Sequence, residues 1–172
     1  MLIKHITGSY KKTQKLGEIF AEQIIKNKLQ NPPAGGAMVV GLQGDLGSGK
    51  TTFIQGFAKG LGIGEKILSP TFVILKRFKI TKKSFKNFYH IDCYRLKNEK
   101  DILELDFKKI ILNPENIVAI EWPEKIKKVL SRLQSNRGSS TKSGPKKTII
   151  IKFNLIDENK REITLSRFLK ML

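Results

Sequence analysis

Eight consecutive residues follow the pattern of a phosphate-binding loop, in which glycines, a lysine and a hydroxyl occur at fixed positions. They are Gly44, Asp45, Leu46, Gly47, Ser48, Gly49, Lys50 and Thr51. Glycines let backbone N–H groups turn toward an anion without a Cβ clash. We expect Lys50 to act in catalysis by neutralising the β- and γ-phosphates, and Thr51 to place its hydroxyl on Mg²⁺. The motif predicts a site for a magnesium-bound nucleotide.

Two acids stand where such a site needs one, at the end of a buried strand. Glu121 follows the apolar run 117–120, and Asp92 follows the more mixed run 88–91. The first arrangement matches Walker B geometry, in which the acid holds the water shell of the metal. An ordinary strand-end carboxylate is the alternative for each, and for Asp92 the residues alone leave both interpretations open. We therefore predict that Glu121 is a metal ligand and a catalytic residue.

Three further residues are candidates for nucleotide contacts. Thr52 follows the loop motif directly, and Thr71 lies in the segment 69–71, where a switch loop would approach the γ-phosphate. Trp122 adjoins the metal acid and could offer a stacking surface. A plain turn is the alternative for Thr71, and a core position is the alternative for Trp122. His90 is interpreted as a packed or hydrogen-bonded strand residue rather than a base.

The elements around the loop are predicted in the order strand, loop, helix. The run 37–42 is short and nearly all apolar, as expected for a central parallel strand covered on both faces. Beyond the loop, apolar residues recur at helical spacing from Phe53 to Leu61, and glycines end the element. The segment 10–29 is predicted to be an amphipathic helix that ends before two prolines.

The rest of the chain adds strands and helices to the same unit. Two aromatic and β-branched runs predict a hairpin, helical spacing returns twice, and a second buried strand and a terminal hairpin follow. The predicted segments are the hairpin 72–80 with 85–94, a helix at 100–111, a strand at 116–120, a helix at 124–133, and the hairpin 148–155 with 161–165. We therefore expect a single α/β domain over 1–172, a P-loop NTPase-like three-layer fold with a central mostly parallel sheet flanked by helices and a C-terminal β-hairpin.

Composition limits the classes of protein. The 172 residues carry 33 Lys and Arg against 15 Asp and Glu, a formal charge of +18, which suits a polyanionic or acidic partner or a general lysine-rich bias. The segment 134–147 has no large apolar residue and no acid, so we expect a disordered basic loop. The single Cys93 forms no internal disulfide, and two His argue against a Cys/His metal site. Without an apolar run of about 20 residues or a signal peptide, we expect a cytoplasmic protein without membrane contact.

A set of motifs in this chain, taken together, resembles the TsaE family, also called YjeE. The motifs are G-D-L-G-S-G-K-T-T at 44–52, S-P-T-F at 69–72, H-I-D-C-Y-R-L at 90–96 and E-W at 121–122. The resemblance covers about residues 9 to 125. These proteins are small bacterial ATPases needed to make threonylcarbamoyl adenosine next to the anticodon of certain tRNAs.

The resemblance implies roles for individual residues. It makes Lys50 and Thr51 the phosphate and Mg²⁺ ligands of ATP and Glu121 the metal acid, favours a functional and catalytic role for Asp92, and places Thr13 near the base. It also implies two partner proteins, TsaB and TsaD, which stimulate a feeble ATPase, with tRNA contacted through the complex. The segment 134–147 has no counterpart in the family pattern.

Two other functions remain open at the level of sequence. A P-loop small-molecule or nucleoside kinase would use Asp92 and Arg95 to bind its acceptor, but arginines for a lid are few between Lys97 and Lys147. A basic RNA-binding module would use the nucleotide site only to regulate affinity, and its RNA binding would depend steeply on salt. The leading prediction is an ATPase that supports tRNA modification.

Overall fold

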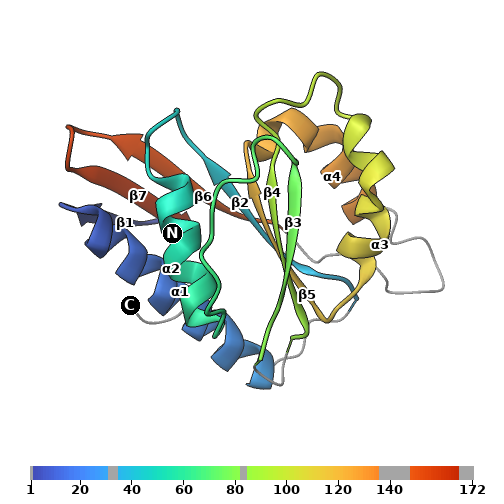
Figure 1. Ribbon diagram of the computed structural model, residues 1–172, viewed down its shortest axis with the longest axis horizontal. Helices are drawn as coiled ribbons and strands as arrows, with labels where there is room; N and C mark the ends of the chain where they lie inside the picture. Colours follow the sequence, from blue (N-terminus) through green and yellow to red (C-terminus); the bar gives the residue numbers. More distant parts are fainter. Residues whose placement is uncertain (1, 31–34, 82–84, 136–147, 167–172) are drawn as a thin grey trace.

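The computed structural model describes residues 2–30, 35–81, 85–135 and 148–166, which form one seven-stranded sheet with helices against it (Figure 1). The strands are β1 (Leu2–Thr7), β2 (Met38–Gln43), β3 (Leu75–Lys79), β4 (Asn87–Asp92), β5 (Asn116–Glu121), β6 (Ile149–Leu155) and β7 (Arg161–Ser166). The helices are α1 (Tyr10–Gln30), α2 (Lys50–Gly60), α3 (Phe107–Leu112) and α4 (Lys127–Ser135), with 3₁₀ helices η1 (Asp101–Leu105) and η2 (Pro123–Ile126). No helix among these residues is long and apolar enough to span a bilayer.

The sheet is parallel in its centre and antiparallel at both edges. Its order is β1-β7-β6-β2-β5-β4-β3. β2 pairs in parallel with β5 and β6, and β4 pairs in parallel with β5. β3, β7 and β1 add antiparallel pairs at the two sides. This arrangement confirms the predicted α/β class, the parallel central sheet and the C-terminal hairpin.

Helices cover both faces of the sheet and produce three layers. In β2, Val40 and Leu42 belong to the core shared with α1 and α2, whereas Val39 belongs to the core shared with α3 and α4. A strand with apolar side chains on both faces must be covered on both, which explains the nearly continuous apolar run in this strand. Figure 1 shows α1 and α2 on one side and α3 and α4 on the other.

Several predicted boundaries were wrong. The strand predicted from 72 begins at Leu75, because 71–73 form a turn and Ile74 has a left-handed φ of 64°. The helix predicted over 100–111 is a 3₁₀ helix and an α-helix, separated at Asp106 with φ 55°. Helical periodicity cannot reveal such breaks, because the apolar spacing continues across them.

One strand was not predicted from the sequence, and one predicted loop boundary was wrong. β1 pairs with β7, which lies more than 150 residues along the chain, and no local turn signals that pairing. The helix predicted at 124–133 begins with η2 and continues as α4 to Ser135. The first two residues of the predicted loop 134–147 are therefore helical, and its remainder, 136–147, lies outside the described residues.

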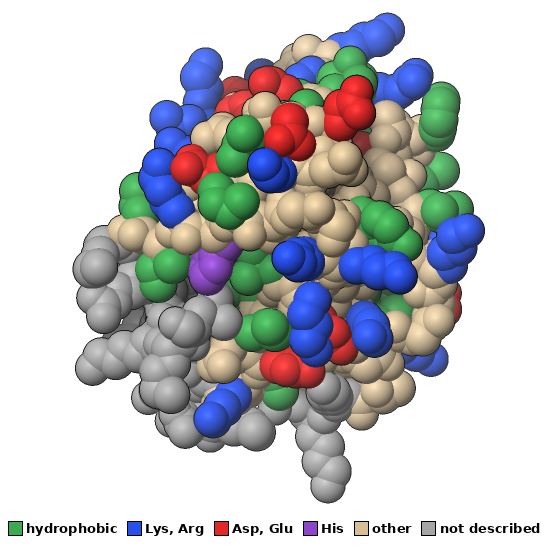
Figure 2. Space-filling view, turned by 90° about the vertical axis from the view of Figure 1, so that its left-hand side faces the viewer, with side chains coloured by type: hydrophobic (Ala, Val, Ile, Leu, Met, Phe, Trp, Pro, Cys, Tyr) green, Lys and Arg blue, Asp and Glu red, His purple; other side chains and the backbone are tan. Residues whose placement is uncertain are grey.

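Basic side chains on the surface are interspersed with acids. On the face in Figure 2, Lys and Arg lie in several separate groups with Asp and Glu between them. Glu18 accepts from Lys15 at 3.0 Å and pairs with Lys59 at 3.3 Å, while Lys4 pairs with Glu162 at 3.1 Å. The positive charge therefore does not form one continuous stripe on this face.

Glycines let α1 and α2 approach closely. A Cβ at Gly56 would overlap the backbone carbonyl of Gln14, and a Cβ at Gly17 would overlap the carbonyl of Phe53. Both glycines are buried in the contact between the two helices. Because the obstacles are backbone atoms, a side chain at either position would require the helices to separate. This contact holds α2, and with it the phosphate loop, against the first helix.

We expect Gly56→Ala to lower the free energy of unfolding by about 1–3 kcal/mol, because overpacking outweighs the roughly 1 kcal/mol that alanine gains in a helix. Urea denaturation measures this change. Gly64→Ala is the control, since no atom lies within 4 Å of a Cβ there. Equal stability of the two variants would contradict the close helix contact.

Candidate nucleotide site

The phosphate-loop motif connects the end of β2 to the start of α2. Gly44 and Gly49 have φ values of 145° and 98°, which glycine tolerates without strain. The N-terminus of α2 has no side-chain cap and no acidic residue in its first turn. Its first N–H groups and the positive end of the helix dipole are therefore available to an anion at the loop.

Lys50 lies at the centre of this loop. Its Nζ donates to the carbonyl oxygens of Gly44 and Asp45, both at 2.7 Å, and lies 4.3 Å from the centre of the Trp122 ring. Burial lowers the pKa of Lys50, opposed chiefly by the negative charge of Glu121. A phosphate would compensate this buried ammonium more fully than carbonyl dipoles do.

Trp122 lies both at the core and at the site. It has a left-handed φ of 59°, and its backbone N–H donates to the Leu42 carbonyl at 3.2 Å. Its side chain packs partly against the core near α4. Its half-buried ring also contacts Lys50 and lines the adjacent cavity. The two alternatives considered for Trp122, core and site, therefore describe different parts of one side chain.

Parallel pairing brings the two predicted acids to the same edge of the sheet. Asp92 at the end of β4 lies beside Glu121 at the end of β5, and Glu121 lies beside Leu42 of β2. Since the phosphate loop follows β2 directly, both carboxylates lie next to it. Both side chains are buried. The carboxyl ends of parallel strands are the usual ligand site of open α/β sheets.

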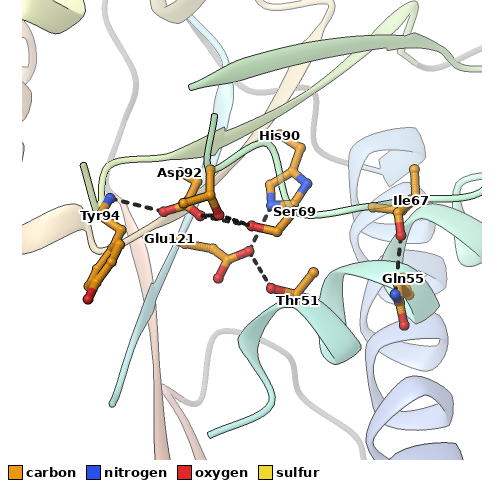
Figure 3. A network of polar contacts seen from close by, with 9 residues as sticks. Thr51, Gln55, Ile67, Ser69, His90, Asp92, Tyr94 and Glu121 are labelled. Atoms are coloured by element: carbon orange, nitrogen blue, oxygen red, sulfur yellow. Dashed lines mark hydrogen bonds and ion pairs between the residues drawn. The ribbon is translucent and has the colours of Figure 1, made fainter. Parts of the chain in front are cut away.

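Glu121 connects three elements through hydrogen bonds (Figure 3). Its Oε1 accepts from the hydroxyl of Thr51, at the first turn of α2, at 2.9 Å. The same oxygen lies 2.9 Å from Nε2 of His90 on β4. The Thr51 hydroxyl thereby donates its hydrogen bond to the carboxylate and keeps its oxygen lone pairs for a cation.

Asp92 holds the segment 69–74 against the sheet. Its Oδ2 accepts from the hydroxyls of Ser69 at 2.8 Å and Thr71 at 2.6 Å, and its Oδ1 accepts from the N–H of Tyr94 at 2.9 Å. The backbone N–H of Asp92 donates to the carbonyl of Ile74 at 2.9 Å. The predicted switch segment is therefore connected to the end of β4, beside Glu121 at the end of β5.

A cavity of about 460 Å³ lies at the meeting point of these segments. It is lined by Leu46, Gly47, Gly49, Lys50, Thr51, Thr52, Ser69, Thr71, Asp92, Tyr94, Arg95, Glu121 and Trp122. Most predicted site residues are thus brought together around one space. Gly44, Asp45 and Ser48 shape the loop behind it.

Thr13 is placed behind the loop rather than in the cavity. It is fully buried, and its hydroxyl lies 2.8 Å from that of Thr7 and donates to the Ser9 carbonyl at 3.3 Å. Its methyl group lies 3.7 Å from the position that a Cβ would take at Gly49. At the site, Thr13 therefore contacts the phosphate loop.

Arg161 is a site residue that no sequence motif predicted. Nε of this residue, at the start of β7, lies 3.6 Å from the Cβ position at Gly49, and its Nη1 donates to the Glu158 carbonyl at 3.0 Å. A second cation therefore lies beside the phosphate loop, on the side of Thr13. No local motif indicates this position, because it depends on the pairing of β6 and β7 and their place in the sheet.

Asp92→Ala should release the segment 69–74. The variant leaves two hydroxyls and one N–H group without their acceptor, at a cost of about 1–3 kcal/mol in the free energy of unfolding. Amide hydrogen exchange should become faster in 69–74. Asp157→Ala is the control, because Asp157 also accepts from two backbone N–H groups but lies on an exposed turn. Unchanged exchange in 69–74 of Asp92→Ala would contradict this role.

Comparisons with known proteins show the family of this chain. The family model described as threonylcarbamoyl adenosine biosynthesis protein TsaE matches residues 7–162. A protein of Rickettsia prowazekii named tRNA threonylcarbamoyladenosine biosynthesis protein TsaE is 36% identical over 128 residues, 74% of this chain and 78% of the relative. A protein of the same name from Rickettsia felis is 32% identical over 157 residues, 91% and 75% of the two chains.

A solved structure extends the likeness to the fold. The crystal structure of Bacillus subtilis YdiB superimposes with a TM-score of 0.60 at 25% identity, covering 96% of this chain and 84% of that one. The family match spans both the phosphate loop and the strand-end acids. These findings confirm the resemblance noted in the motifs, and the chain belongs to the TsaE family.

Proposed function

We propose that this protein binds Mg–ATP in the cavity around Lys50 and hydrolyses it, and that this activity supports threonylcarbamoyl modification of the tRNA adenosine next to the anticodon. The observation that carries the proposal is the 2.9 Å hydrogen bond from the Thr51 hydroxyl to Glu121. It joins the phosphate-loop helix to the acid at the end of β5, as a metal-dependent nucleotide site requires. The tRNA role rests on the names of the relatives.

The phosphates would bind at the N-terminus of α2. The uncapped N–H groups there and the ammonium of Lys50 compensate their charge. Binding moves the Lys50 ammonium from the carbonyls of Gly44 and Asp45 to the phosphate oxygens. Arg161, beside Gly49, adds positive charge on the side of Thr13. We infer that this side of the loop receives the α-phosphate and nucleoside part of ATP.

Thr51 and Glu121 fit a magnesium ion. Mg²⁺ takes oxygen ligands and keeps several waters, so two protein groups with phosphate oxygens are enough. Among the described residues no group of three His, Cys, Asp or Glu side chains forms a separate metal cage. When bound, the ion would neutralise charge that develops on the β- and γ-phosphates.

Asp92 would couple the γ-phosphate to the segment 69–74. The hydroxyl of Thr71 reaches the cavity and is held by this carboxylate. The carboxylates of Glu121 and Asp92 hold Thr51 and the segment 69–74, and among the described residues that line the cavity there is no further carboxylate to serve as a separate general base for water. This arrangement supports an ATPase that is slow alone and faster when a partner completes the site.

We propose as those partners TsaB and TsaD, which the family resemblance implies, and exposed apolar side chains beside the cavity offer a surface for them. Leu46, Phe72 and Val73 are 73%, 83% and 64% exposed. Phe72 lies 4.3 Å from the guanidinium of Arg95, which lines the cavity. Exposed apolar groups at the mouth of a polar site mark a surface for a protein partner. In line with the family resemblance, we propose that tRNA is contacted through the complex, and the face shown in Figure 2 carries no continuous basic stripe.

Lys50→Ala and Glu121→Ala test the site in different ways. Lys50→Ala should abolish ATP binding, because the phosphate charge loses its main counter-charge. Glu121→Ala should retain much of the binding and lose hydrolysis, because the loop still holds the phosphates while metal placement fails. Calorimetric titration with ATP and single-turnover release of inorganic phosphate measure the two effects.

The control for both variants is Lys59→Ala, an exposed lysine of α2 outside the cavity. Wild-type ATP affinity in Lys50→Ala would contradict the phosphate site. Hydrolysis by Glu121→Ala within a factor of about three of wild type, about 0.7 kcal/mol on the barrier, would contradict the metal role. Transfer of phosphate to an added nucleoside instead of water would indicate a kinase.

Phe72→Ser should weaken stimulation by TsaB and TsaD. Truncating a central aromatic contact costs about 2 kcal/mol, which raises the partner concentration for half-maximal stimulation about thirtyfold. ATPase activity measured alone should stay within about twofold of wild type. Leu2→Ser is the matched control, because Leu2 is 64% exposed at the opposite end of β1 from the site. Equal stimulation of both variants would place the partner surface elsewhere.

A further inference from the structure

His90 is a buried polar residue whose role the proposed ATPase leaves unexplained. Its side chain is 0% exposed, and it does not line the cavity. It therefore cannot touch a nucleotide. Its Nε2 lies 2.9 Å from Oε1 of Glu121, whereas its Nδ1 has no hydrogen-bond partner among the described residues.

The hydrogen bond gives the imidazole a direction. The carboxylate of Glu121 is an acceptor, so Nε2 of His90 is the donor, and Nδ1 is a buried ring nitrogen without a partner among the described residues. A buried polar atom without a partner destabilises the folded protein, and an apolar side chain would avoid that cost. A buried polar atom without a hydrogen-bond partner is an exception that is expected chiefly at functional sites.

Two donors hold the same oxygen of Glu121. Thr51 approaches Oε1 from α2, and His90 approaches it from β4 (Figure 3). Two hydrogen bonds from separate elements restrict rotation of the carboxylate more than one does. Oε2 is outside both of these bonds and is the oxygen left for other ligands.

β4 thereby carries one acid of the site, Asp92, and positions the other, Glu121, through His90. His90 and Asp92 are two residues apart on this strand, so their side chains lie on the same face. Asp92 holds the hydroxyl of Thr71 at 2.6 Å, and His90 holds Glu121. The switch segment and the metal acid are connected through one rigid strand.

We propose that His90 is a positioning residue that fixes the carboxylate of Glu121 for the Mg²⁺ of the bound nucleotide. This inference rests on the proposed Mg–ATP site and goes beyond it, because it gives a role in metal binding to a side chain that touches neither nucleotide nor metal. Replacing His90 should therefore change only the binding that depends on Mg²⁺. Nucleotide binding without Mg²⁺ depends on the loop and Lys50 and is not altered by His90.

The experiment compares three variants of the full chain. His90→Gln keeps an N–H donor near the position of Nε2, His90→Asn is polar but too short to reach Glu121, and His90→Phe fills the space without a donor. ADP affinity is titrated with EDTA and with Mg²⁺, and ATP hydrolysis is measured across a series of Mg²⁺ concentrations.

In EDTA, ADP affinity of all three should stay within about twofold of wild type. With Mg²⁺, His90→Phe and His90→Asn should require at least about tenfold more Mg²⁺ for half-maximal binding and hydrolysis. His90→Gln should recover most of the wild-type response. His5→Phe is the matched control, because it makes the same change at the chain's other histidine, on the edge strand β1.

Wild-type Mg²⁺ dependence in His90→Asn, or equal behaviour of the Gln and Asn variants, would overturn the inference. The Gln and Asn variants decide the question even if His90→Phe does not fold. A purely structural role would lower stability in all three without changing the Mg²⁺ requirement. If wild type shows no Mg²⁺-dependent nucleotide binding, the proposed function fails and the inference fails with it. If wild type binds nucleotide in a Mg²⁺-dependent way and the His90 variants show the same Mg²⁺ dependence, the proposed function stands and the inference fails.

Discussion

The parallel pairing of β5 with β2 and β4 is the constraint on which the site depends. Its register places Glu121 beside Leu42 on one side and beside Asp92 on the other. These neighbours are at the carboxyl edge of the sheet, where the chain leaves β2 as the phosphate loop. A shift of one residue in either pairing would turn the carboxylates to the other face of the sheet. Such a shift would exchange the β5 side chains of the two cores, which differ in size, and would carry Glu121 away from Thr51, so packing and the polar network both oppose it.

Backbone contacts then place the loop against its neighbours. A Cβ at Gly44 would overlap the carbonyl of Phe153 on β6, and Gly56 lets α2 lie directly on α1. Glycine is required at these points because other chain segments occupy the space of a side chain. The phosphate loop is therefore held from the sheet on one side and from α1 on the other, so that its N–H groups are preorganised for an anion.

A network of hydrogen bonds orients the polar side chains at this edge of the sheet. Thr51, His90 and Glu121 join the loop helix to two strands, and Asp92 joins Thr71 to the same edge. Each carboxylate accepts from groups of different elements, so the position of the segment 69–74 and that of Glu121, the proposed metal acid, are not independent. Exposed apolar residues around the mouth leave this network open to a protein that covers it. This accessibility agrees with the proposed stimulation by partner proteins.

Local patterns in the sequence determined the phosphate loop between strand and helix, the acid at the end of the buried strand and the C-terminal hairpin, because each depends on residues near one another in the chain. The TsaE family followed from four such motifs taken together. Only the tertiary structure decided that β1 joins β7, that Arg161 lies beside Gly49, that Thr13 lies behind the loop, and that His90 holds Glu121. These contacts join segments far apart in sequence, and their geometry depends on strand order and helix packing, which hydrophobic periodicity does not specify.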